Sequence, residues 1–81
     1  MPRLTRLSGT DVVAILLGFG FEAVSQRGRD VKLRRVGGGG VHETLHNPLH
    51  RELDTGTCRA ILRQASRYVS ECELGPFFYA D

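Results

Sequence analysis

The chain has 81 residues, 41% of them hydrophobic and 25% charged, and a net charge of +2, a composition typical of one small folded domain. Its longest apolar run, residues 12–17, is far shorter than the ~20 residues of a membrane-spanning helix, and no secretory signal peptide is recognisable, so we expect a cytoplasmic protein without membrane contact. The two cysteines, Cys58 and Cys72, are too few for a small domain stabilised by several disulfide bonds, and we expect them to be reduced.

Residues 8–20 have the start, the periodicity and the end of a helix. Ser8 can cap the first turn, and Asp11 at the third helical position completes a capping box. Gly20 supplies the left-handed residue with which many helices end. The apolar positions recur every three or four residues and form one stripe: they are Val12, Ile15, Leu16 and Phe19.

A first strand is predicted over residues 21–27. Strict alternation would place Phe21, Ala23 and Ser25 on the same face of this strand. The next two residues, Gly28-Arg29, suit a tight turn that reverses the chain.

Two more strands follow. Residues 31–36 alternate apolar and basic side chains, which is typical of a half-buried strand. The four glycines 37–40 have no propensity for helix or strand and predict a flexible loop. Residues 41–46 can return as a third strand, which Asn47-Pro48 is expected to end, because proline cannot donate to a sheet.

A second helix should begin within residues 54–57, which offer several N-caps. After it, Gly75-Pro76 interrupts the chain before the aromatic residues 77–79, which can pack back on the sheet. The apolar stripe of the second helix repeats at helical spacing: it consists of Cys58, Ile61, Leu62 and Ala65.

The element order is therefore α-β-β-β-α. This order predicts an α+β fold in which two helices cover one face of a three-stranded antiparallel sheet. Residues 1–70 would form the domain, and residues 71–81 an acidic and aromatic tail that packs on it.

Basic residues are concentrated in one segment, residues 27–35. Lys32 and Arg34 should project from the face opposite Val31 and Leu33, and a basic sheet face is typical of contact with a phosphate backbone. A solvated face with no ligand would have the same composition. The candidate RNA-binding side chains are Arg27, Arg29, Lys32, Arg34 and Arg35.

Three histidines, His42, His46 and His50, are spaced by four residues. On a helix they could bind a metal, but the neighbouring glycines and Pro48 make a helix improbable, so we expect no metal site. They can be exposed side chains, or one can transfer protons near neutral pH. The chain also lacks a phosphate-binding loop, a catalytic carboxylate pair and a nucleophile elbow, which excludes the ordinary hydrolases and nucleotide-binding proteins.

Three segments together resemble the HicA toxin family, over residues 4 to about 70 and in the right order. They are Leu7-Ser8-Gly9 through the helix to Gly20-Phe21; Gln26-Arg27-Gly28 with Val31-Lys32-Leu33-Arg34; and Pro48-Leu49-His50 followed by Leu53-Asp54-Thr55-Gly56-Thr57 and Arg59-Ala60-Ile61-Leu62-Arg63-Gln64-Ala65.

The resemblance implies a fold similar to double-stranded-RNA-binding domains, cleavage of messenger RNA without a metal or other cofactor, and neutralisation by a HicB-like antitoxin protein. In that family the turn after the first strand reads Gly-Ser-His, and its histidine is catalytic. The matching residues here are Gly28, Arg29 and Asp30, so Asp30 occupies the catalytic position. His50 matches a second histidine that recurs in the family.

Three functions are compatible with these residues. The first is a HicA-like RNA-binding toxin whose nuclease activity is weakened or lost, because Asp30 is a weaker base than histidine and repels a phosphodiester. The second is an active endoribonuclease that uses His46 or His50 for proton transfer. The third is a non-catalytic module that binds only a protein partner.

Overall fold

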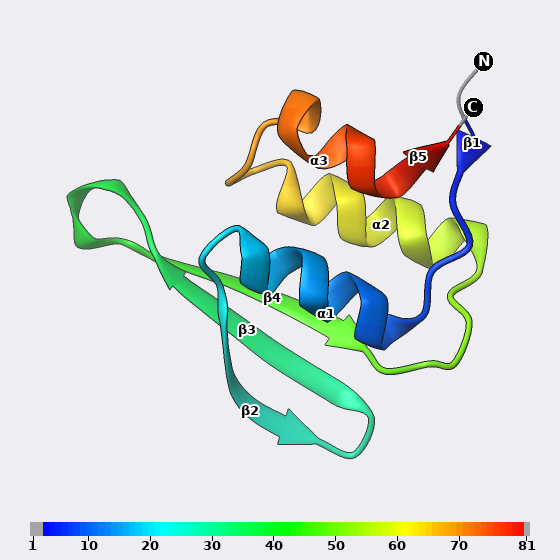
Figure 1. Ribbon diagram of the computed structural model, residues 1–81. Helices are drawn as coiled ribbons and strands as arrows, with labels where there is room; N and C mark the ends of the chain where they lie inside the picture. The colour runs from blue at the N-terminus through cyan, green and yellow to red at the C-terminus, as the bar shows by residue number, and fades with distance from the viewer. Residues whose placement is uncertain (1–2, 81) are drawn as a thin grey trace.

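The computed structural model describes residues 3–80, which form three α-helices, a three-stranded antiparallel sheet of order β2-β3-β4 and a two-stranded antiparallel sheet, β1-β5. Figure 1 shows the helices gathered on one side of the molecule and the β3–β4 hairpin extending beyond them. The predicted α+β class with its α-β-β-β-α core is confirmed. The elements are β1 (Arg3–Leu4), α1 (Gly9–Gly18), β2 (Glu22–Arg27), β3 (Asp30–Val36), the 3₁₀ turn η1 (Gly38–Gly40), β4 (His42–Pro48), α2 (Thr55–Ala65), α3 (Glu71–Phe78) and β5 (Tyr79–Ala80).

Helix α1 begins and ends as its sequence predicts. The Oγ of Ser8 accepts a hydrogen bond from the Asp11 N–H (3.0 Å), and the Ser8 N–H donates to the Asp11 carboxylate (2.9 Å). The Ser8 N–H, with a smaller contribution from the Ser8 side chain, holds the pKa of Asp11 below its ordinary value, because it stabilises the charged carboxylate. At the other end Gly20 has a φ of +94°, and the N–H groups of Gly20 and Phe21 donate to the carbonyls of Leu17 and Leu16, which closes the helix.

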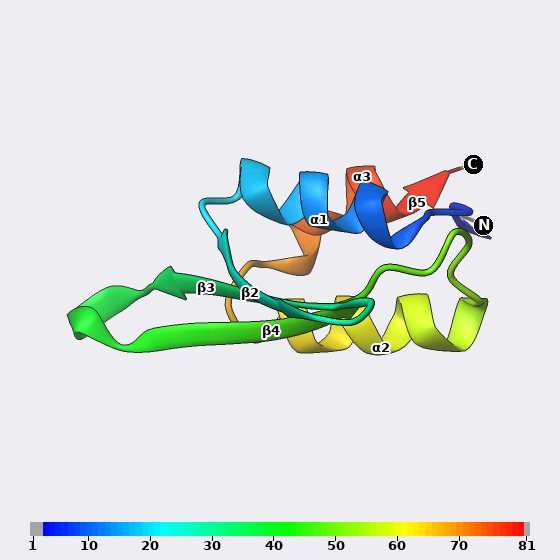
Figure 2. The same ribbon diagram turned by 90° about the horizontal axis from the view of Figure 1, so that it is seen from below.

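The core lies between the helices and one face of the sheet. Helices α1 and α2 each lie against β4, and Figure 2 shows the strands overlapping in a thin layer with α1 on one side of it. The strands contribute buried Val31, Leu33 and Leu45 to this core. The predicted apolar stripe of α2 is buried along its whole length, since Cys58, Ile61, Leu62 and Ala65 are each at most 5% exposed. Burial also raises the pKa of the Cys58 thiol.

We expect Leu62→Ala to lower the free energy of unfolding by about 2–5 kcal/mol, because it removes a buried side chain and leaves a cavity. Leu62 is 3% exposed, whereas Leu17 on α1 is 47% exposed, so Leu17→Ala is the matched control and should cost less than about 1 kcal/mol. Thermal and urea unfolding measure both effects. A Leu62→Ala protein that melts within a degree of the parent would mean that α2 does not pack in this way.

The segment after α2 is helical, so the prediction that Gly75-Pro76 interrupts the chain is wrong. Ser70 caps α3 by accepting a hydrogen bond from the Glu73 N–H (3.3 Å). Leu74 and Phe78, one turn apart, are both completely buried in the core. Their burial outweighs the unfavourable position of Pro76 inside the helix, a case in which tertiary packing overrides helix propensity.

The predictions for β4 and the glycine loop also need correction. Strand β4 continues through Pro48, which pairs with Asp30, instead of ending before Asn47. Proline is tolerated there because β4 is an edge strand of the sheet, so its backbone need not donate on both sides. The glycines 37–40 form a tight turn containing η1, in which the Gly37 N–H donates to the Val41 carbonyl (2.8 Å). Within residues 3–80 no helix has the length and apolar character needed to cross a bilayer.

Candidate nucleic-acid interface

The face of the sheet opposite the core carries the candidate site. Strand register places Ser25 of β2 and His46 of β4 on either side of Lys32 in the central strand β3. In the next row, Arg27 and Pro48 lie on either side of Asp30. Because directly opposed residues share a face, these two rows form one surface, which we call the open face.

A β-bulge brings Ser25 and Arg27 to the open face. Ala23 pairs with Leu33 and Ser25 with Lys32, so Val24 is an extra residue without a partner in β3. Beyond such a residue the alternation of side chains is shifted by one position. The prediction that Ala23 and Ser25 share a face is therefore wrong: Ala23 is paired with buried Leu33, whereas Ser25 is paired with Lys32 on the open face.

The turn between β2 and β3 is held in place from two directions. Gly28 has a φ of +61°, and no other residue of the turn has a positive φ, which fits the two-residue turn that begins with glycine. The side-chain amide of Gln26 donates to the Gly28 carbonyl (3.0 Å), and the Leu49 N–H donates to the Arg29 carbonyl. These bonds hold the backbone that leads into Asp30.

The side chains of the two rows surround a hollow of about 420 Å³, lined by Ser25, Arg27, Asp30, Lys32 and His46. Within residues 3–80 the ion pairs are Arg6–Glu52 and Arg35–Glu43, so neither Arg27 nor Lys32 is neutralised by a described side chain. Two cations free to contact an anion therefore border the hollow, together with one carboxylate and one imidazole. Within residues 3–80 no group of three His, Cys, Asp or Glu side chains is placed to hold a metal ion.

Arg34 extends the open face along β3. It pairs with Glu22 on β2 and with Thr44 on β4, in the row beyond Lys32. Its side chain is half-buried, and its Nε has no hydrogen-bond partner among the described residues. Arg34 thus carries a third basic side chain, without an ion-pair partner among the described residues, on the same face as Lys32.

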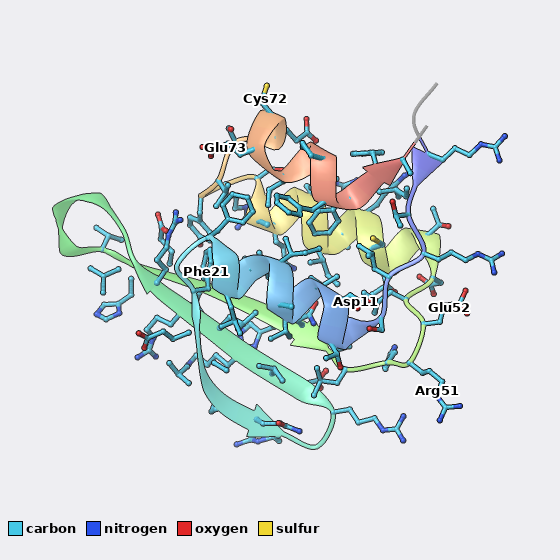
Figure 3. The ribbon with its side chains drawn as sticks, in the orientation of Figure 1. Asp11, Phe21, Arg51, Glu52, Cys72 and Glu73 are labelled. Atoms are coloured by element: carbon cyan, nitrogen blue, oxygen red, sulfur yellow. The ribbon has the colours of Figure 1, made fainter. Side chains whose placement is uncertain are left out.

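Arg35 lies on the other face and serves the fold. Its guanidinium donates to Glu43 on β4 (2.7 Å) and to the carbonyls of Phe19 (2.9 Å) and Tyr68 (3.0 Å). The same group stacks 4.8 Å from the centre of the Phe21 ring, and Figure 3 shows Phe21 where the chain leaves α1 for β2. With its donors occupied by the protein, Arg35 is separated from the other candidate RNA-binding side chains.

Two further candidates, Arg29 and His50, lie outside the hollow. Arg29 is exposed in the turn, and it is its backbone carbonyl, not its side chain, that accepts the hydrogen bond from the Leu49 N–H. His50 follows β4, and its carbonyl accepts from the Gly9 N–H at the start of α1 (2.8 Å). The His50 side chain is near Asp54, whose pKa is lowered mainly by hydrogen bonds from Thr57 and to a smaller extent by the charge of His50. Next to it, Arg51 points away from the sheet (Figure 3).

Asn47 explains why the end of β4 and the start of α1 are so close. It is completely buried, and its side-chain amide donates to the Gly9 carbonyl (2.9 Å). A Cβ at position 9 would overlap the Pro48 carbonyl and the Leu49 Cα, so only glycine allows this approach. The open face is thereby fixed to the helix layer at the end that carries Asp30.

Ser25 was missed by sequence reasoning, because a bulge leaves no signal in a strand as short as β2. Arg35 was grouped with the RNA-binding candidates, although alternation from Val31 and Leu33 already places it on the face where its guanidinium bonds within the protein.

Comparison with known proteins identifies the family. A family model for the HicA toxin of bacterial toxin–antitoxin systems matches residues 9–66, from the first residue of α1 to Ser66, which caps the end of α2. A search of curated proteins finds no match, and neither does a search of solved structures. The matched range is well over half of the chain and contains the whole open face, so the chain belongs to the HicA toxin family, the toxin components that are partnered by an antitoxin.

Proposed function

We propose that this toxin binds RNA through its open face and that its ribonuclease activity is weakened by Asp30. The observation that carries the proposal is the hollow in which Arg27 and Lys32 lie without an ion-pair partner from the described residues. Arg34, with a buried Nε that lacks a partner, continues the same basic surface. Arginine and lysine side chains on one face neutralise backbone phosphates and give affinity without choice of sequence.

The chemistry of Asp30 supports the second half of the proposal. Its position corresponds to that of the catalytic histidine implied by the resemblance to the family, and it lies at the border of the hollow. A carboxylate is a weaker base than imidazole by over two units of reference pKa, so it is less able to take the proton of a 2′-hydroxyl. Its negative charge also opposes the charge that grows on a phosphodiester in the transition state.

The partner that best suits this toxin is a HicB-like antitoxin protein. Membership of the family supports a toxin–antitoxin pair. RNA and the antitoxin are the two partners in this proposal, and a small-molecule cofactor is not part of it.

The salt dependence of RNA binding tests the open face. Replacing Lys32 and Arg34 together by alanine should make the plot of log affinity against log salt shallower by about 1.4, because each lost phosphate contact removes about 0.7 from the slope for single-stranded RNA. The affinity of a labelled RNA oligonucleotide can be measured by fluorescence anisotropy at several salt concentrations.

The matched control is Arg59→Ala with Arg63→Ala, which removes the same charge from a surface between α2 and α3. Its slope should equal that of the parent. An equal change in both double variants would show that net charge alone matters. No RNA binding at low salt would exclude an RNA-binding function and leave a module that binds only a protein partner.

A further inference from the structure

We infer that His46 is the proton-transfer group of a slow ribonuclease centre in the hollow, an inference that rests on RNA binding at the open face. His46 is exposed on β4, directly opposite Lys32, and lines the hollow. Asp30 is opposite Pro48, so His46 is its diagonal neighbour. Diagonal neighbours on one sheet face are about 7–8 Å apart, close enough for both side chains to reach a single phosphodiester.

The composition of the hollow leaves one side chain with suitable acid–base chemistry. Arg27 and Lys32 are cations at neutral pH, and Asp30 is an anion. Imidazole alone exists in both protonation states near neutrality, so it can accept a proton and then return it.

The other two histidines are placed differently. His42 also belongs to β4 and to the open face, but it pairs with Val36 near the tip of the hairpin and borders a separate hollow beside Arg34. His50 follows the strand and lies near Asp54 at the start of α2. Of the three histidines spaced by four residues, only His46 borders the hollow that contains Arg27, Asp30 and Lys32.

The reaction consistent with this arrangement is an internal transesterification of RNA. The 2′-oxygen of one ribose attacks the adjacent phosphorus, and the bond from that phosphorus to the 5′-oxygen of the next nucleotide breaks. Neutral His46 accepts the proton of the 2′-hydroxyl and, as the imidazolium, gives it to the departing 5′-oxygen. The products are a 2′,3′-cyclic phosphate and a 5′-hydroxyl, which together contain every atom of the substrate, so no further reactant is consumed.

The neighbours of His46 suit the same step. Lys32 opposite His46, and Arg27 in the next row, can contact the non-bridging oxygens and stabilise the charge that develops on them. Asp30, at the edge of the same hollow, acts against this stabilisation. The centre should therefore be active but slow.

His46→Ala tests the inference. The parent should cut an RNA oligonucleotide into products with 2′,3′-cyclic phosphate and 5′-hydroxyl ends, and should bind but not cut the DNA oligonucleotide of the same sequence, which lacks the 2′-hydroxyl. His46→Ala should reduce the cleavage rate at least about 100-fold, since a general acid–base group contributes about 10²–10⁴-fold. Added imidazole should restore part of the rate, which a merely structural residue would not allow.

The matched control is His42→Ala, which removes the same side chain from the same strand and face, two rows away from the hollow, and its cleavage rate at saturating RNA should equal that of the parent. Because His46 is exposed, His46→Ala should also keep the parent's melting temperature. Undiminished cleavage by His46→Ala would overturn the inference, as would a parent that is saturated with RNA and does not cut it. In the latter case RNA binding at the open face still stands, whereas a parent that binds no RNA contradicts the proposed function itself.

Discussion

Asp30→His should raise the rate of RNA cleavage by about 10²–10⁴-fold, because it places a second proton-transfer group at the border of the hollow and removes the opposing negative charge. The turn before residue 30 is held by hydrogen bonds from Gln26 and Leu49, neither of which involves the side chain at position 30. The substitution should therefore leave the backbone in place. A cleavage assay on the purified protein measures the gain, and expression of the variant in bacteria should arrest growth where the parent does not.

Asp30→Asn is the matched control, since it removes the charge without supplying a proton carrier. It should tighten RNA binding and leave cleavage within a few fold of the parent. Combining Asp30→His with His46→Ala should leave much of the gained activity, because the new histidine does not depend on the old one. If Asp30→His binds RNA but gains no activity, position 30 is not catalytic in this scaffold.

Arg35→Ala should lower the free energy of unfolding by about 3–5 kcal/mol, the usual cost of breaking a buried ion pair by removing one partner. The loss leaves Glu43 without its cation, and its side chain is only 16% exposed. It also removes the donors that reach the carbonyls of Phe19 and Tyr68, which tie the end of α1 and the residues after α2 to the sheet. Chemical denaturation measures the change.

The neighbouring arginine supplies the comparison. Arg34 differs from Arg35 by one position and by the face to which it points, and it has no ion pair among the described residues. Arg34→Ala should cost about 1 kcal/mol or less in stability and should instead weaken RNA binding. Equal stability losses in the two variants would show that Arg35 does not join the helices to the sheet.

Local signals in the sequence predicted most of the elements. The ends of α1 depend on residues within one turn of each other, Ser8 with Asp11 and Gly20 with the last carbonyls, so a short stretch of sequence contains the whole motif. The apolar stripe of α2 was equally readable, because periodic burial follows from helix geometry alone.

The features that were mispredicted depend on contacts distant in the sequence. Helix α3 forms despite Pro76 because Leu74 and Phe78 are buried in a core made by other elements. Ser25 faces Lys32 only because Val24 is bulged out against β3. His46 could be named as a candidate from its chemistry, but its position beside Lys32 required the register of β3 against β4.

The pairing of β1 with β5 also determines the order in which this toxin can fold at the ribosome. Leu4 pairs with Tyr79, and Leu74 and Phe78 complete the core. Synthesis proceeds at about 5–20 residues per second, so all of the family-matched range, residues 9–66, exists before any of these later residues. The first strand must remain without its partner until residue 80 has emerged, and bringing such distant segments together is a slow kind of step. The core of the nascent domain is therefore complete only after α3 and β5 have been synthesised.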